Sequence, residues 1–337
     1  MKSLLLVLGI YLNLTASIIF AAQSNFEDNP EKYPFIGNWS GKVTHTENPT
    51  YKKFPNLNAQ VFLSLNGNYK LKLVEKLYKR ANPILQVSAR VRNNRIAFKG
   101  KGWNIIFSKD GTATGTFDNG ESTLELKKEI FYSPTLGLKP PTGAVVLFNG
   151  EDMHQWEHTD GRDPTWSVLK NQCIQTVSRK GNFNKNEENG IGGDIVTKEG
   201  FGSMKFHMEF RYAVEPNKSS QGRGNSGLFF VDIGEIQILN SFGLEGYWNE
   251  CGAFYKKSPP LVNAAGPPLN WQSYDVELNL VGESAPYKKA TVTAYLNGHK
   301  IHSEVDFELK KFLDNVKIKL QDHTNILQFR NIWLFEI

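Results

Sequence analysis

Met204–Arg211 reads Met-Lys-Phe-His-Met-Glu-Phe-Arg, an unbroken alternation of apolar and polar residues. Successive side chains of a β-strand point to opposite faces, so this stretch predicts one strand with an apolar face and a polar face. Residues 275–280 and 291–296 repeat the pattern, and Leu228–Val231 is apolar on both faces, as in a central strand. Together these strands predict that residues 144–337 form a β-sandwich of the jelly-roll type.

The chain before this region is also rich in short strands. Gln60–Leu65 and Tyr69–Leu73 flank an Asn-Gly pair, Asn66-Gly67. An Asn-Gly pair between two apolar stretches is typical of a β-hairpin. Similar stretches follow as far as Glu129, so residues 23–132 are predicted to form an accessory antiparallel β domain, either a small sheet or a barrel.

Residues 133–143 interrupt both patterns. The segment reads Ser-Pro-Thr-Leu-Gly-Leu-Lys-Pro-Pro-Thr-Gly, with three Pro and two Gly. This composition is typical of an extended, semi-rigid linker. We therefore place the boundary between the accessory domain and the jelly-roll domain in this segment.

The first residues have the features of a secretory signal peptide. Lys2 precedes an apolar stretch, Leu4–Phe20, and Ala21 supplies a small residue at its end. These features predict that residues 1–22 are removed and that the mature protein is secreted or periplasmic. No later stretch is long and apolar enough to cross a bilayer, so we expect no transmembrane segment in the mature chain.

The composition excludes some partners and leaves others open. The 337 residues include 39 Lys and Arg against 34 Asp and Glu, a net charge of +5. That excess is small and spread along the chain, so we expect no nucleic acid partner. Aromatic residues make up 12% of the chain, which suits both sugar binding and an aromatic β core. The oligomeric state is undetermined.

The chain has two cysteines, Cys173 and Cys251. In an exported protein they permit one disulfide, and two buried thiols are the alternative. The spacings typical of zinc sites, CxxC and HExxH, do not occur.

Ordered stretches along the second half carry a resemblance to a known family. They are Ala144–Gly150 with Trp156, Gly193–Lys198, Gly224–Gly227, Glu235–Ser241, Cys251–Tyr255, Pro259–Asn263, Trp271–Asp275, Leu320–His323 and Phe329–Trp333. In this order they resemble the 3-keto-disaccharide hydrolase domain family, which has a concanavalin-like jelly roll. The segment Ser133–Gly137 resembles exported members that carry an extra N-terminal β domain.

The resemblance implies an enzyme, a glycoside hydrolase or lyase, that acts on glycosides whose C3 hydroxyl is already oxidised to a ketone. The ketone acidifies the C2 proton, so a base can remove it to form an enolate. The enolate expels the substituent at C1, and water adds to the resulting enone. Such a site needs a general base, a group that stabilises the enolate oxygen, and an acid for the leaving oxygen.

Glu235 and His323 are the predicted catalytic residues. Glu235 and Gln237 are two positions apart, so both project from one face of a strand, about 7 Å apart. A hydrogen-bonded polar pair without catalytic function is the alternative for them. An ordinary imidazole changes its charge near neutral pH, so a histidine such as His323 suits an acid, a base or a metal ligand. The cofactor is undetermined, with a divalent metal ion as one option.

Six further residues are predicted to bind substrate. They are Gln237, Arg211, Asn225, Tyr255, Trp271 and Asp322. Arg211 suits stabilisation of an oxyanion or binding of hydroxyls, and Asn225 lies in a turn before an apolar strand. The sequence departs from the family pattern at Asn240, where members often carry Asp, which puts substrate choice in question.

A non-catalytic carbohydrate-binding module is the alternative function. It would use the same face of the sandwich and the aromatic residues Tyr247, Trp248, Tyr255 and Trp271. Sugar affinity that survives Glu235→Gln, without any product, would distinguish it from the enzyme.

Overall fold

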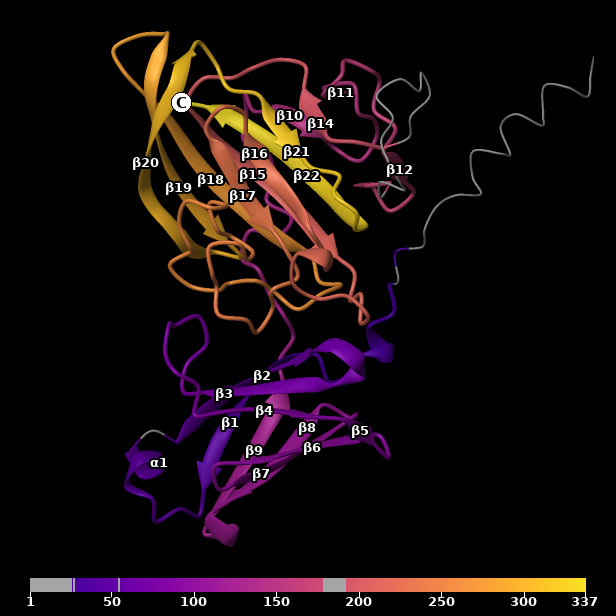
Figure 1. Cartoon of the computed structure of the whole chain (residues 1–337), viewed down its shortest axis with the longest axis vertical. Coiled ribbons are helices and arrows are strands. Elements are labelled where there is room, and N and C mark those ends of the chain that lie inside the picture. Colours follow the sequence, from indigo (N-terminus) through magenta and orange to yellow (C-terminus); the bar gives the residue numbers. More distant parts are fainter. Residues whose placement is uncertain (1–25, 27, 54, 178–191) are drawn as a thin grey trace, which may run out of the picture.

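The computed structural model describes residues 26, 28–53, 55–177 and 192–337. The predicted signal peptide, residues 1–22, lies outside the described residues. No helix in the described part of the chain is long and apolar enough to cross a membrane. The architecture is all-β, with a nine-stranded N-terminal sheet and a sandwich of two further sheets (Figure 1).

The N-terminal sheet is antiparallel throughout. Its strands are β1 (Gly37–Thr44), β2 (Asn56–Leu63), β3 (Tyr69–Val74), β4 (Leu85–Ala89), β5 (Val91–Arg92), β6 (Arg95–Gly100), β7 (Trp103–Ser108), β8 (Thr112–Phe117) and β9 (Ser122–Lys128). They pair in the order β4-β3-β2-β1-β9-β8-β7-β6-β5, and β4 lies against β6, so the sheet curls into a barrel-like form. One short helix, α1 (Pro49–Lys53), joins β1 to β2.

The predicted hairpin is confirmed as β2 and β3. Leu63 pairs with Tyr69 at its closed end. Asn66 and Gly67 in the turn have φ angles of 61° and 70°, a left-handed conformation that Asn and Gly adopt most readily. The apolar residues of this region fill one core, around the fully buried Trp39, Phe98 and Phe107.

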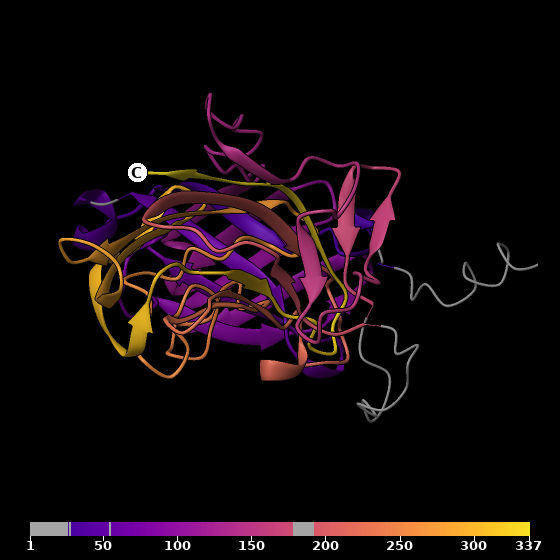
Figure 2. The same cartoon turned by 90° about the horizontal axis from the view of Figure 1, so that it is seen from above.

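The sandwich consists of an eight-stranded and a five-stranded sheet. The large sheet contains β10 (Val145–Phe148), β12 (Ser167–Leu169), β13 (Cys173–Gln175), β15 (Met204–Tyr212), β18 (Gln272–Val281), β19 (Tyr287–Leu296), β20 (His299–Leu313) and β22 (Leu327–Glu336). The small sheet contains β11 (Trp156–His158), β14 (Ile195–Thr197), β16 (Ser226–Phe230), β17 (Gly234–Ile238) and β21 (Ile318–Leu320). Figure 2 shows the two sheets from above.

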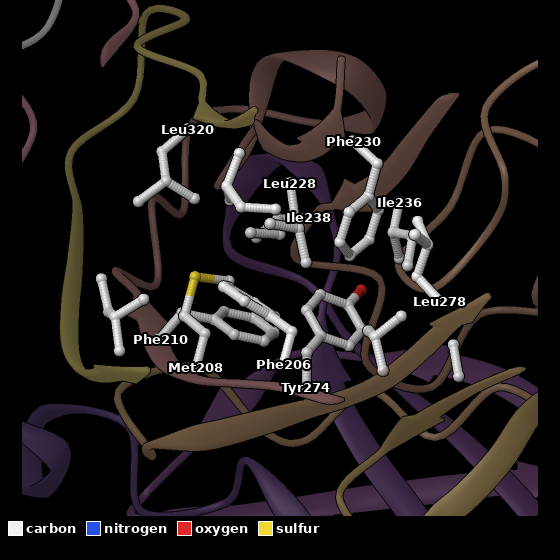
Figure 3. Close-up of a cluster of buried hydrophobic side chains, with 14 of the residues drawn as sticks. Phe206, Met208, Phe210, Leu228, Phe230, Ile236, Ile238, Tyr274, Leu278 and Leu320 are labelled. Carbon is white, nitrogen blue, oxygen red and sulfur yellow. The ribbon is translucent and has the colours of Figure 1, made fainter. Parts of the chain in front are cut away.

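The core of the sandwich confirms the alternation predicted for Met204–Arg211. Phe206, Met208 and Phe210 point from β15 toward the small sheet (Figure 3). Ile236 of β17 and Leu228 of β16 point back toward them, and both side chains are completely buried. The polar residues of these strands therefore lie on the two outer faces of the sandwich. The predicted jelly-roll class is confirmed.

The segment after β9, residues 133–137, is hydrogen-bonded to the outer face of the large sheet. The Ser133 hydroxyl lies 2.6 Å from that of Ser273, and Thr135 donates a hydrogen bond of 2.6 Å to Asp275. Gly137 N donates to the carboxylate of Glu209 at 2.5 Å. The predicted linker thus lies along the sandwich, and the division into two domains within residues 133–143 stays a prediction.

Both cysteines are free and buried. Cys173 lies in β13 of the large sheet. The thiol of Cys251 is 3.4 Å from the hydroxyl of Tyr274. The pair of buried thiols, and not the disulfide, is what the structure contains.

Candidate functional site

The predicted catalytic strand is β17, at one edge of the small sheet. Ile236 and Ile238 of this strand face the core, so Glu235 and Gln237 face outward. Beyond β17, the backbone N of Tyr255 donates to the carbonyl of Glu235 at 3.0 Å, and Phe254 pairs with Ile236. Phe254 is buried in the core, so Tyr255 points to the same outer face as Glu235.

The carboxylate of Glu235 lies against Gly227 of the neighbouring strand β16. A Cβ at position 227 would stand 2.4 Å from Glu235 Oε1, so only glycine leaves room for this carboxylate. Burial raises the pKa of Glu235 to about 7; the cation of Lys319 opposes this, Asp194 adds to it, and Lys256 opposes it. A carboxyl with this pKa is suited to accept a proton near neutral pH.

Lys319 supplies positive charge on the same face. It is in β21, in register with Phe229 of β16, and Phe229 is in turn in register with Glu235. Its ammonium group lies 3.7 Å from the centre of the Phe229 ring and 2.9 Å from Asp194 Oδ2. Lys319 therefore combines a cation with a fixed position, which suits stabilisation of a developing negative charge.

Asp322 and Asn225 are buried and hydrogen-bonded. Asp322 is 1% exposed, and its Oδ2 accepts from Gly193 N at 3.0 Å, while its own N donates to Asp194 Oδ1 at 3.1 Å. Asn225 is 3% exposed and donates to the backbone carbonyl of Gln221 at 2.7 Å. Hydrogen bonds within the chain hold both residues, and their role in substrate binding stays a prediction.

Gln237 belongs to the same buried polar layer. It is 2% exposed, and its Nε2 donates to Gln221 Oε1 at 3.1 Å. Gln221 in turn donates to the carbonyl of Asn249 at 2.7 Å. The bonds of Gln237 thus link the strand that carries Glu235 to the turn around Asn249.

His323 follows the small-sheet strand next to Gly227. The strand β21 ends at Leu320, and Gln321 N donates to Gly227 O at 3.0 Å. The half-buried His323 imidazole has Nδ1 3.2 Å from the Thr324 hydroxyl. The two predicted catalytic residues therefore come from β17 and from the end of β21, the strands on either side of β16.

Arg211 and Trp271 lie on the opposite outer face, that of the large sheet. Arg211 donates to Gln328 at 2.7 Å and pairs with Asp28 at 2.8 Å. Its guanidinium lies 4.9 Å from the ring centre of Trp271. Because the core separates the two outer faces, the prediction that Arg211 and Trp271 share a substrate site with Glu235 is corrected.

Several residues of this face were not predicted. Lys319 alternates with the apolar Ile318 and Leu320, a pattern from which its outward direction follows. For Gly227 and Gln221 the sequence carries no such signal, because their importance depends on contacts with Glu235 and Gln237. Asn240 donates to the carbonyl of Ala213 at 3.4 Å and is 5% exposed, so it is a buried structural residue here.

The described residues contain no group of three or more His, Cys, Asp or Glu side chains placed to hold a metal ion.

Comparison with known proteins finds similar solved structures and one matching family. The chain is similar to a candidate glycosyl hydrolase of Parabacteroides distasonis, with 28% identity over 59% of this chain and 86% of that chain and a TM-score of 0.48. A second candidate glycosyl hydrolase of the same organism has 21% identity over 58% and 94% of the two chains and a TM-score of 0.41. A β-1,3-1,4-glucanase from a mouse hindgut metagenome has 11% identity over 57% and 97% and a TM-score of 0.33.

The curated proteins include no match to this chain. A family model does match, over residues 143–335, and it describes the 3-keto-alpha-glucoside-1,2-lyase-like domain. This range contains both sheets of the sandwich and the whole Glu235 face. The chain belongs to the family of 3-keto-alpha-glucoside-1,2-lyase-like domains, a carbohydrate-active family.

Proposed function

We propose that this protein is an enzyme that cleaves 3-keto-glycosides, with Glu235 as the general base. The observation that carries the proposal is the outward carboxylate of Glu235, whose burial raises its pKa to about 7. A base with this pKa is about half ionised at pH 7 and accepts a proton readily. Ordinary glycosidases place two opposed carboxylates around the glycosidic bond, whereas 3-keto chemistry needs one base at C2.

The reaction proceeds in balanced steps. Glu235 removes the proton from C2, and the electron pair of that C–H bond forms the enolate of the C3 ketone. The enolate re-forms the ketone, a C1=C2 double bond forms, and the C1–O bond breaks. The leaving oxygen takes a proton. Water then adds to C1 and gives a proton to the group that protonated the leaving oxygen, Glu235 returns its proton to C2, and the product is the free 3-keto sugar.

Two further side chains, Lys319 and His323, are assigned to the other steps of this reaction. Lys319 lies near Glu235 and has its position fixed by Asp194 and by the Phe229 ring, so we assign it to the developing enolate oxygen. His323 follows β21 on the other side of β16, and we assign it to protonation of the leaving oxygen. Gln237 and Asn225 both bond Gln221, which ties the strand that carries the base to the neighbouring turn.

The test is turnover of a 3-keto-disaccharide by purified protein, beside the unmodified disaccharide as control. We expect cleavage of the keto substrate alone, because without the ketone the C2 proton is not acidic enough. In D₂O, recovered substrate or product should carry deuterium at C2. Glu235→Gln should lower the rate ~10²–10⁴-fold with the fold intact. Equal cleavage of both sugars, or full activity of Glu235→Gln, would overturn the proposal.

A binding module without catalysis would give a different result. Such a protein would bind the disaccharide, form no product, and keep its affinity in Glu235→Gln. Repeating the assay with a chelator tests whether a divalent metal ion is required.

A further inference from the structure

A turn next to Glu235 presents exposed aromatic side chains to solvent. It runs from Glu245 to Glu250, and it contains Tyr247 and Trp248, which are 57% and 48% exposed. The Trp248 ring lies 5.9 Å from the ring of Tyr255. Tyr255 lies beside Glu235, since its backbone N donates to the Glu235 carbonyl. The aromatic pair thus continues the outer face of the small sheet beyond the candidate base.

This turn is held firmly in place. The Glu250 carboxylate accepts from Gly246 N at 2.6 Å and from Tyr247 N at 3.1 Å. Gln221 binds the carbonyl of Asn249, which connects the turn to the amide of Gln237. A large aromatic side chain that is half exposed on a rigid turn is organised for binding before any ligand arrives.

The N-terminal sheet supplies the remaining bonds. Arg80, in the loop between β3 and β4, donates to the carbonyls of Gly246 and Pro260 at 2.6 Å each. It also donates to the carbonyls of Leu261 at 3.0 Å and Glu245 at 3.3 Å. Lys72 of β3 pairs with Glu245 at 3.0 Å. One guanidinium therefore joins two loops of the sandwich to the N-terminal sheet.

We propose that Trp248 and Tyr255 form a second sugar subsite, which binds the ring attached to C1 of the 3-keto sugar, and that Arg80 positions it. This rests on the proposed function, since it names the leaving group of that reaction. The C–H face of a pyranose packs on an aromatic ring, while its hydroxyls need polar neighbours. Lys256, whose ammonium is 5.4 Å from the Tyr255 ring centre, supplies one.

A sugar ring suits this surface better than an apolar protein partner. Two aromatic rings at an interplanar angle of 51° form a small platform, and charged Lys256 borders it, since its backbone N donates to Trp248 O at 3.4 Å. The position also agrees with the chemistry, because a ring bonded to C1 must extend away from the base that removes the C2 proton. The N-terminal sheet, which has no other assigned function, thereby contributes to substrate choice through Arg80.

The test compares a 3-keto-disaccharide with the methyl 3-keto-glycoside, which lacks the second ring. Trp248→Ala should lower kcat/KM for the disaccharide about tenfold more than for the methyl glycoside, mainly by raising KM. Trp248→Phe keeps an aromatic ring and should retain most of the wild-type kcat/KM for the disaccharide. Phe312→Ala removes another exposed aromatic side chain, in β20, and should change neither value. Equal effects of Trp248→Ala on both substrates would overturn the proposal.

Arg80 is tested as a positioning residue. The selectivity ratio is kcat/KM for the 3-keto-disaccharide divided by kcat/KM for the methyl 3-keto-glycoside. Arg80→Gln should lower this ratio by about three- to tenfold. Lys79→Gln, in the same loop, should leave the ratio unchanged. The double variant Arg80→Gln/Trp248→Ala should lose little more than Trp248→Ala alone, because both changes act on one platform. Full additivity would show that Arg80 does not act through Trp248.

Failure of the subsite and failure of the proposed function give different results. If the wild-type protein cleaves no 3-keto substrate, calorimetry with the unmodified disaccharide and its monosaccharide still tests the platform. Disaccharide binding weakened about tenfold by Trp248→Ala would then retain the subsite and reject the enzyme. Unchanged affinity would reject the subsite.

Discussion

The Glu235 carboxylate occupies the space that a side chain at Gly227 would fill, with Oε1 2.4 Å from where a Cβ would stand. Gly227 lies in β16, flanked by β17 and β21. The absence of one side chain thus lets the candidate base fold down against the sheet, where burial raises its pKa to about 7.

Gly227→Ala should therefore displace the base while the strand pairs as before. A methyl group at 2.4 Å from a carboxylate oxygen forces that side chain to another position. We expect kcat/KM on a 3-keto-glycoside to fall about 10²-fold, the effect of roughly 1 Å of misplacement. Gly222→Ala is the control, because its added Cβ would have no neighbour within 4 Å. Unaltered activity of Gly227→Ala would show that the position of Glu235 does not matter.

The pH dependence of activity follows from the same carboxyl. A base must be ionised, and the pKa of Glu235 is about 7. The value of kcat/KM should rise about tenfold per pH unit below pH 7 and level off above it. A profile that is already flat at pH 5 would contradict the assignment of Glu235 as the base.

The contribution of Glu235 to the free energy of unfolding should fall as pH rises, whereas activity rises. The native pKa of Glu235 is about 7, above the ordinary value of 4.5, so the native state binds more protons between these values. Its contribution to the free energy of unfolding therefore falls as pH rises from 4.5 to 7, by at most about 1.4 kcal/mol per unit. Chemical denaturation of wild type and Glu235→Gln at pH 4.5 and 8 measures this. A relative stability that does not shift in favour of Glu235→Gln at pH 8 would contradict the raised pKa.

Lys319→Met should move the activity profile to higher pH. Lys319 lowers the pKa of Glu235, so removing this cation leaves burial and Asp194 less opposed and raises that pKa further. We also expect a lower plateau rate, because the enolate loses its cation. Lys317→Met is the matched control, since Lys317 is two residues earlier and pairs with Glu157 instead. An identical shift in both variants would point to a general charge effect.

Glu209→Ala should release the segment after Ser133 from the sandwich. Burial opposes ionisation of Glu209, but hydrogen bonds from His207, Asn331, Gly137 N and Arg330 outweigh it and lower its pKa to about 2. Without this carboxylate the buried His207 and the partly exposed Arg330 lose a partner, which typically costs about 1–3 kcal/mol. Limited proteolysis should then cut variant protein between residues 133 and 143 much faster than wild type. Equal cleavage rates would show that Gly137 is held by other bonds.

The contribution of Glu209 has its own pH window. Its native pKa of about 2 is below the ordinary 4.5, so the ionised carboxylate stabilises the fold fully above pH 4.5. This stabilisation is lost as pH falls from 4.5 through 2. The difference in unfolding free energy between wild type and Glu209→Gln should narrow over that range.

Export remains a prediction from Lys2 and the apolar Leu4–Phe20. We propose that the mature chain begins near Ala22 or Gln23. Mass spectrometry of protein recovered from the cell envelope or the medium should find this N-terminus, and an intact Met1 there would contradict it.

Strand alternation predicted that Glu235 and Gln237 project from one face of a strand, and the structure places both on the outer face of β17. Alternation is a local property, because each side chain points opposite to its neighbour whatever the strand packs against. For this reason the outward direction of Glu235, Gln237 and Arg211, and the hairpin at Asn66, were predictable from residue order alone.

What alternation does not contain is which of two outer faces a polar residue occupies. Arg211 and Glu235 both point away from the core, but β15 and β17 belong to different sheets, so the hydrophobic layer separates them. Packing between distant segments also decides three other features. These are the pKa of Glu235, the space above Gly227, and the hydrogen bonds from Arg80 to residues more than 160 positions away. The sequence by itself determined the strands and their inward and outward faces, and only the tertiary structure decided which outward residues meet, because burial and proximity arise when the sheets pack together.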